Sequence, residues 1–259
     1  MQNLSISIIQ TNLIWQNPEA NRSVLEQQID KISTATDLVV LPEMFTTGFT
    51  MESNQHSEPM DGLSIKWMAD IAYRKNCVIT GSLIVEENDL FYNRLIWMRP
   101  DGTYEHYDKR HLFRFAGETE CFTAGNNKLI VELKGWRICP LICFDLRFPV
   151  WSRNQENYDC LIYIANWPEA RSKAWKTLLE ARAHENQCFV IGVNRVGKDG
   201  NDIQYSGDSA LISPKGELLS NLNPYEENIE TITLNLEELN EFRRKFPVAL
   251  EADKFKINL

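Results

Sequence analysis

The chain has 259 residues, of which 43% are hydrophobic and 24% charged, values typical of a folded globular protein rather than a disordered or fibrous one. Its 27 Lys and Arg residues are outnumbered by 36 Asp and Glu residues, and the net charge of -9 argues against a surface that binds nucleic acid or anionic membranes. No apolar run reaches the roughly 20 residues of a membrane span, and no basic segment typical of a secretory signal opens the sequence, so we expect a soluble, cytoplasmic protein.

The first half of the chain alternates apolar runs with helix-like spacing. Leu38–Leu41 does not alternate in polarity, so we expect a strand buried on both faces that ends at Pro42. The expected strands are Leu4–Ile9, Leu38–Leu41, Cys77–Val85, Leu90–Met98 and Gly102–Tyr107, the last two joined by a turn at Pro100-Asp101-Gly102. The expected helices carry the stripes Leu25, Ile29, Ile32 and Leu63, Trp67, Ile71.

The second half continues the pattern with more hairpins, which indicates a mixed α/β (α+β) sheet structure covered by helices. Strands are expected over Lys128–Leu133, Trp136–Phe144, Cys160–Ala165, Cys188–Asn194, Tyr205–Ile212 and Glu227–Leu236. A helix carries the stripe Ala174, Leu178, Ala181, and a charged helix over Glu237–Lys245 is expected to be solvated or to pack against a partner subunit. We find no repeat and no linker, so we expect one domain over residues 1–259 with a short tail from about 246.

The six cysteines lack the spacing of a metal or disulfide site. No C-x-x-C pair occurs, and five of the six lie in or beside apolar runs, where a reduced cysteine packs as a small hydrophobe. His56, His106 and His184 form no pattern of ligands and are expected to be ordinary surface or core residues. The sequence therefore predicts neither a metal nor an organic cofactor.

Three polar residues stand at positions that packing alone explains poorly. Glu43 directly follows the buried strand and Pro42, Cys143 ends the apolar run that begins at Ile138, and Lys109 lies in a charged segment. Ligands usually bind at strand ends of an α/β sheet, so Glu43 and Cys143 point to one crevice. Taken singly, each residue also fits a structural interpretation: a solvated loop acid, an inert buried thiol and a surface lysine.

Around these residues the sequence resembles the nitrilase (carbon–nitrogen hydrolase) superfamily, whose members use a Glu–Lys–Cys triad. The similarity covers nearly the whole chain, in six segments that occur in the family's order. The segments are Leu41-Pro42-Glu43, Tyr107–Phe113, Leu141–Pro149, Ala165-Asn166-Trp167-Pro168, Ala181–Gln187 and Gly207-Asp208-Ser209. One segment would be weak evidence, but six in register are specific.

The resemblance implies catalytic roles for Glu43, Lys109 and Cys143. Amide hydrolysis needs a nucleophile, a proton shuttle and a stabiliser of the tetrahedral oxyanion. Cys143 is expected to form a thioester, with Glu43 as general base and Lys109 holding the oxyanion together with the backbone N–H of Phe144.

A second carboxylate is common in the superfamily, seven residues before a glycine that opens the next strand. Gly125 points back to Glu118 by this rule, and Glu120 is a close competitor. We expect Glu118 to position Lys109 and the substrate amide. A solvated loop acid is the alternative interpretation.

Several further residues near the triad are open to more than one interpretation. Asp145 and Arg147 are expected to pair with each other or to cap the following segment. Trp167 and Trp175 either wall the pocket or belong to the core.

His111, two residues from Lys109, is expected to orient the loop. A substrate with a distal carboxylate needs a cation, and Arg171 or Arg114 fits that role, although either also fits a surface charge.

Within the superfamily the sequence is most similar to the bacterial omega-amidase (2-oxoglutaramate amidase) branch. The resemblance implies hydrolysis of the ω-amide of small dicarboxylic acid monoamides such as 2-oxoglutaramate and succinamate. It also implies a four-layer α-β-β-α sandwich formed when two subunits pack as a homodimer. The alternatives are another superfamily reaction, that of a deaminated-glutathione amidase, a carbamoylase or a nitrilase, and a non-catalytic scaffold.

Overall fold

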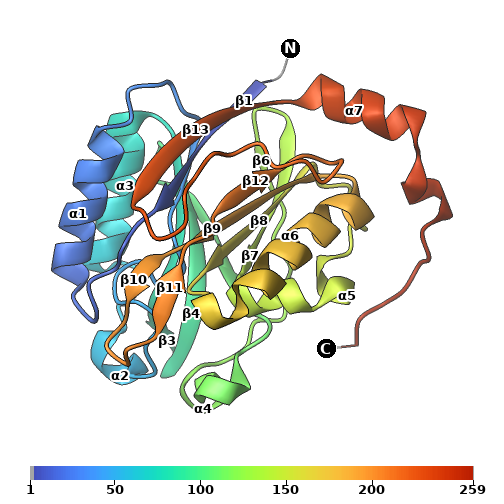
Figure 1. Ribbon diagram of the computed structural model, residues 1–259. Helices are drawn as coiled ribbons and strands as arrows, with labels where there is room; N and C mark the ends of the chain where they lie inside the picture. Colours follow the sequence, from blue (N-terminus) through green and yellow to red (C-terminus); the bar gives the residue numbers. More distant parts are fainter. Residues whose placement is uncertain (1–2, 259) are drawn as a thin grey trace.

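The computed structural model describes residues 3–258 and contains two β-sheets that pack face to face, with helices on both outer sides (Figure 1). The strands are β1 (Asn3–Gln10), β2 (Leu38–Val40), β3 (Val78–Glu87), β4 (Leu90–Met98), β5 (Tyr104–Asp108), β6 (Val131–Leu133), β7 (Trp136–Ile142), β8 (Cys160–Ala165), β9 (Phe189–Asn194), β10 (Val196–Lys198), β11 (Gln204–Ser206), β12 (Ala210–Ile212) and β13 (Asn228–Asn235). The larger sheet has the order β13-β1-β2-β3-β4-β5 and the smaller one β12-β9-β8-β7-β6, while β10 and β11 pair separately.

The buried side chains of each helix show which sheet the helix covers. They are α1 (Pro18–Asp30), α2 (Ser53–His56), α3 (Leu63–Lys75), α4 (Glu118–Cys121), α5 (Pro149–Ser152), α6 (Ser172–Asn186) and α7 (Leu236–Lys245), with 3₁₀ turns at Arg114–Ala116, Cys143–Arg147, Glu169–Arg171 and Val248–Glu251. On the outer face of the larger sheet, α1 and α3 bury Leu25 and Met68 against Val39. On the smaller sheet, α6 buries Trp175 and Leu179.

The two sheets share one apolar core. Ile6 and Trp97 of the larger sheet and Ile138 and Leu141 of the smaller sheet belong to a single buried cluster and are shielded from solvent. The order of layers is therefore helix, sheet, sheet, helix, and all four layers come from one chain (Figure 1). The predicted α-β-β-α architecture is confirmed, and one chain already contains its four layers; the packing of two such chains stays a prediction.

Parallel strands at the centre of each sheet bring their carboxyl ends to the functional region. β1, β2 and β3 are parallel, as are β7, β8 and β9. The continuous apolar run of β2 is buried on both faces, as parallel strands covered by helices require. Glu43, Cys143 and Asn166 come soon after β2, β7 and β8.

Some predicted elements differ from the structure in their bounds. The strand expected over Trp136–Phe144 ends at Ile142, because Cys143 adopts a left-handed backbone (φ 44°) that starts a 3₁₀ turn. The strand expected over Tyr205–Ile212 is broken by positive φ angles at Gly207 and Asp208. Of Lys128–Leu133, only Val131–Leu133 is strand.

Two predicted helical stripes are shifted along the helix surface. In α6 the buried residues include Trp175 and Leu179 rather than Ala174 and Leu178, and Leu63 of α3 is 68% exposed. The stripe that includes Leu25 and Ile29 in α1 is buried as expected. Within residues 3–258, no helix combines the length and apolar character that a membrane crossing needs.

Candidate active site

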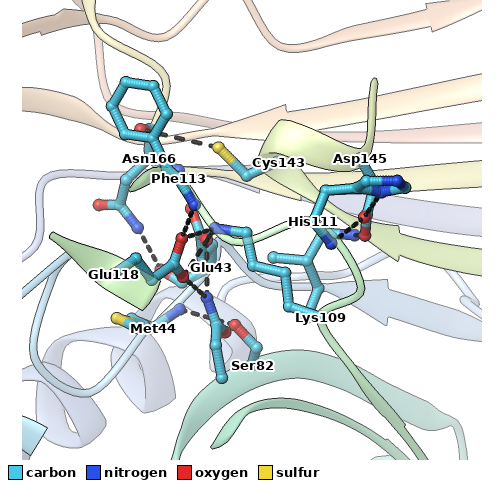
Figure 2. Close-up of polar contacts among 12 residues, drawn as sticks. Glu43, Met44, Ser82, Lys109, His111, Phe113, Glu118, Cys143, Asp145 and Asn166 are labelled. Atoms are coloured by element: carbon cyan, nitrogen blue, oxygen red, sulfur yellow. Dashed lines mark hydrogen bonds and ion pairs between the residues drawn. The ribbon is translucent and has the colours of Figure 1, made fainter. Parts of the chain in front are cut away.

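Four segments distant in the sequence meet at one edge of the sandwich, between the two sheets. Glu43 follows β2, Lys109 follows β5, Cys143 follows β7, and Asn166 follows β8. Figure 2 shows these side chains converging together with Glu118, the first residue of α4. The structure thus brings together the three residues of the predicted triad and the predicted second carboxylate.

The ammonium group of Lys109 lies between two carboxylates. Its Nζ is 2.9 Å from Glu43 Oε1, 2.9 Å from Glu118 Oε1 and 3.0 Å from Glu118 Oε2. All three side chains are fully buried. Buried charges persist only when they are paired and hydrogen-bonded, so this cluster excludes the interpretation of Lys109 as a surface cation.

The carboxylate of Glu43 is fixed by donors from three elements. Asn93 Nδ2, on β4, donates to Oε1 over 2.8 Å, and the backbone N–H of Asn166 donates to Oε2 over 2.8 Å. The Asn166 side chain in turn donates to the backbone carbonyl of Glu43 over 2.6 Å. With Lys109 added, Glu43 has a single defined orientation.

Cys143 stands on a sharp turn at the end of β7. Its φ of 44° is unusual for a residue with a Cβ, and such strain is concentrated at functional sites. The thiol is 8% exposed, and its sulfur lies 4.0 Å from the backbone oxygen of Asn166. The turn lifts the sulfur out of the core toward the Glu43–Lys109 pair.

Burial and neighbouring charges set the protonation of the site. Burial raises the pKa of the Cys143 thiol well above its ordinary value, with Glu43 adding to the rise and Lys109 opposing it. Burial lowers the pKa of Lys109, but Glu118 and Glu43 outweigh it and raise the pKa above its ordinary value. Burial also raises the pKa of Glu118, against the effect of Lys109. The site at neutral pH therefore holds a lysine cation and a neutral thiol.

A small cavity of about 70 Å³ opens over the sulfur. Its wall is largely aromatic, formed by Phe49, Phe113, Phe144, Trp167 and Tyr205. Cys143 and Lys109 lie on its inner side, and two guanidinium groups, Arg147 and Arg171, complete the lining. Arg147 lies 5.0 Å from the Trp167 ring centre, and Arg171 lies 5.3 Å from that of Phe113.

The structure shows which of the remaining predicted residues belong to the site and which do not. Glu118 is buried on Lys109, whereas Glu120 is exposed. Arg171 and Trp167 line the cavity, but Arg114 is exposed and is not part of the lining. Trp175 lies on the buried side of α6 and is not part of the cavity lining.

The predicted pairing of Asp145 with Arg147 is wrong. Arg147 lies against Trp167, and Asp145 accepts the N–H of Ile142 (3.1 Å), a capping bond at the start of its own 3₁₀ turn. His111 contacts Asp145 (2.8 Å) and does orient the loop that carries Lys109.

Sequence reasoning missed Asn93 and Phe49. Asn93 contacts Glu43, and its place inside an apolar strand, Leu90–Met98, was the available signal. Phe49 faces Lys109, whose Nζ lies 5.0 Å from its ring centre. Across residues 3–258, no cluster of three or more His, Cys, Asp or Glu side chains has the arrangement of a metal site.

The comparisons with known proteins show the family of the chain. The model of the carbon-nitrogen hydrolase family matches residues 5–244, and the chain belongs to this family. It is 45% identical to the omega-amidase YafV of Escherichia coli, over 99% of this chain and 100% of the relative. It is 34% identical to the 2-oxoglutaramate amidase of Bacillus subtilis, over 94% of this chain and 95% of the relative.

Solved structures show the same fold. A carbon-nitrogen hydrolase superfamily protein from Xanthomonas campestris, with an arsenic adduct in its active site, matches with a TM-score of 0.97 and 43% identity over the whole of both chains. A nitrilase superfamily member from Saccharomyces cerevisiae matches with a TM-score of 0.85 and 22% identity over 95% of each chain, a likeness of fold.

Proposed function

We propose that this hydrolase cleaves the ω-amide of small dicarboxylic acid monoamides, such as 2-oxoglutaramate and succinamate, to the acid and ammonia. The observation that carries the proposal is the buried Glu43–Lys109 pair beside the Cys143 thiol, in a cavity that also holds two arginines. The relatives named omega-amidase and 2-oxoglutaramate amidase favour this reaction over nitrile or carbamoyl hydrolysis.

In the first half-reaction, Glu43 takes the proton of the Cys143 thiol as the sulfur attacks the amide carbon. The raised pKa of the thiol makes this base necessary at neutral pH. The tetrahedral intermediate collapses by expelling ammonia, which receives the proton from Glu43, and an acyl thioester remains on the sulfur. Water then attacks the thioester and gives a proton to Glu43. The acid departs and Glu43 returns the proton to the sulfur.

Lys109 stabilises the oxyanion in both halves. An ammonium group has three N–H donors, and Lys109 Nζ contacts three carboxylate oxygens, Glu43 Oε1 and both oxygens of Glu118. When the oxyanion forms, one of the two Glu118 contacts is exchanged for the oxygen of the intermediate. The backbone N–H of Phe144, which lines the cavity directly after the nucleophile, is the other donor. Glu118 acts through Lys109 by holding its position.

The distal carboxylate of the substrate is bound by the arginines of the cavity, with Trp167 as a wall. Neither Arg147 nor Arg171 forms an ion pair or a side-chain hydrogen bond with any residue in the range 3–258. Both are held by ring contacts alone, so both are free to form charge-assisted hydrogen bonds with an anion. Arg114, which the sequence offered as the alternative to Arg171, has no part in this proposal, and Arg147 takes a role that the sequence did not predict.

The test is ammonia release from 2-oxoglutaramate, succinamate, a carbamoyl amino acid and a simple nitrile, for the wild type and for Cys143→Ala. We expect turnover of the first two amides that Cys143→Ala abolishes. Turnover confined to the carbamoyl compound or the nitrile would overturn the substrate assignment. Turnover that survives in Cys143→Ala would overturn the nucleophile.

We further propose that the chain is one hydrolase domain with a short tail (about 246–259), and that it works as a cytoplasmic homodimer. Support for the dimer comes from apolar side chains left exposed beyond the smaller sheet: Val150 is 55% exposed, Phe246 61% and Leu250 79%. The six free thiols fit a reducing compartment. Light scattering on the purified protein tests the dimer, and a monomeric mass would contradict it.

A further inference from the structure

A further buried carboxylate, that of Asp145, links two segments of the site and is not part of the cavity lining. Its Oδ2 accepts the Tyr107 hydroxyl (2.7 Å) and the N–H of Ile142 (3.1 Å). Its Oδ1 accepts the backbone N–H of His111 (3.0 Å) and the ring Nδ1 of His111 (2.8 Å). Asp145 is fully buried, so these four bonds are not exchanged with water.

The partners of Asp145 lie next to the residues assigned to chemistry. Tyr107 and His111 stand two residues before and after Lys109, while Ile142 immediately precedes Cys143. Figure 2 shows the Asp145–His111 contact on one side of Lys109 and the two glutamates on the other. One carboxylate therefore ties the loop that carries the cation to the turn that carries the sulfur.

The geometry of this link requires a carboxylate. Each oxygen of Asp145 accepts two donors, and an amide in either orientation would turn an NH₂ group toward two of them. The Tyr107 hydroxyl is itself fixed, since it accepts Trp151 Nε1 (3.0 Å) and the N–H of Arg110 (3.1 Å). His111 is held from the other side by Phe148, with ring centres 3.7 Å apart and planes within 5°.

We propose that Asp145 is a positioning residue that sets the place of Lys109 relative to the Cys143 sulfur. The inference rests on the proposed roles of Lys109 and Cys143. Because an oxyanion donor acts only in the transition state, loss of the link lowers kcat and leaves KM nearly unchanged. A misplacement of about 1 Å in such a site costs about a hundredfold in rate.

The first experiment compares Asp145→Asn with Asp159→Asn on the amide that the wild type hydrolyses. Asp159 is a matched control because it is also a buried carboxylate that accepts an N–H of β7, that of Arg137 (3.0 Å). It directly precedes β8, at the end of the strand opposite to Asn166 of the site, which follows β8. We expect kcat to fall about a hundredfold in Asp145→Asn with KM changed less than about threefold. In Asp159→Asn we expect kcat to be unchanged while the melting temperature falls.

A second pair of variants, at His111, separates hydrogen bonding from packing and does not depend on Asp145→Asn being folded. His111→Asn places an amide nitrogen close to the position of Nδ1 and so keeps the donor, but it loses the stack on Phe148. His111→Leu keeps apolar contact with Phe148 and loses the donor. We expect kcat near the wild-type value in His111→Asn and a fall of more than about tenfold in His111→Leu, since hydrogen bonds to charged groups are stronger than those between neutral groups.

The outcomes distinguish the two proposals. A wild type that releases no ammonia from any substrate overturns the proposed function. A wild type that turns over, with full kcat in Asp145→Asn, overturns the positioning role of Asp145. If His111→Leu is active and His111→Asn is impaired, packing on Phe148 matters and the hydrogen bond to Asp145 does not. That result overturns the inference as well.

Discussion

Asn93 donates its side-chain amide to Glu43, with 2.8 Å between Nδ2 and Oε1. The same nitrogen lies 3.4 Å from Glu118 Oε1, and the backbone oxygen of Asn93 accepts the N–H of Lys109. One uncharged residue of β4 thus contacts both carboxylates and the main chain of the lysine between them. It spaces two negative charges that would otherwise be held apart only by the Lys109 ammonium group.

This position makes Asn93 a sensitive probe of the cluster. Loss of the donor in Asn93→Ala is expected to lower kcat/KM by about 10- to 100-fold, the equivalent of about 1.5–3 kcal/mol for a hydrogen bond to a charged group. Asn93→Asp is expected to be worse, because it adds a third carboxylate to a buried site. Steady-state kinetics together with melting temperatures decide the matter, and an Asp variant as active as the Ala variant would contradict it.

The acidic side of the pH profile reports on Glu118. Burial raises the pKa of this carboxyl above its ordinary value of 4.5. Glu118 therefore binds a proton at a higher pH than an exposed glutamate does. Protonation removes one of the two charges that hold Lys109, so kcat/KM is expected to decline at a pH above 4.5.

Glu118→Gln imitates the protonated form at every pH. We expect a lower plateau of kcat/KM in this variant and the loss of the acid step, measured as a pH–rate profile between about pH 4 and 9. An acid step that stays at the same pH in Glu118→Gln would assign that step to another group. Glu120→Gln is the matched control, because Glu120 lies on the same short helix and is exposed.

How far the sequence predicts this site depends on how local each feature is. The strand ends at Val40 and Ile142 place Glu43 and Cys143, and the apolar runs before them are visible in the sequence. The burial of Glu118 rather than Glu120 depends on which way the single turn of α4 faces. Because α4 has only four residues, no hydrophobic periodicity in the sequence indicates its buried side. Asn93 contacts Glu43, 50 residues away, and Asp145 contacts Tyr107, 38 residues away. Such contacts form only in the folded chain, so local sequence patterns do not predict them.

The shifted stripe of α6 has a similar origin. Ala174, Leu178 and Ala181 have helical spacing, but the buried set includes Trp175 and Leu179, one position further along. Trp175 donates its ring N–H to the backbone oxygen of Asp208, a contact that a hydrophobic pattern does not contain. The buried side of the helix therefore carries the large aromatic side chain with its hydrogen bond, and not the alanine stripe.

Close packing of α6 on β9 depends on Gly192. A Cβ at this position would lie 2.5 Å from Leu179 Cδ1 and 2.8 Å from Trp175 Cζ2. Gly192→Ala is therefore expected to destabilise the fold by about 1–3 kcal/mol through overpacking. Adding Leu179→Ala makes room for the methyl group, so the double variant should lose less than the sum of the single losses in denaturant unfolding. Additive losses would show that the two residues do not compete for space.

Recognition of the distal carboxylate is tested by neutralising the arginines one at a time. Arg147→Met and Arg171→Met are each expected to raise KM for 2-oxoglutaramate about 10- to 100-fold, because each removes a charge-assisted hydrogen bond of about 1.5–3 kcal/mol. Neither change should affect KM for a neutral primary amide of similar length.

The exposed Arg114 provides the matched control, since Arg114→Met removes the same charge outside the cavity. Equal effects of all three variants would indicate long-range attraction of the anion by the protein's field rather than direct contact, and raising the salt concentration would then abolish the difference from wild type. An effect confined to Arg147 and Arg171 that persists at high salt assigns both guanidinium groups to the substrate carboxylate.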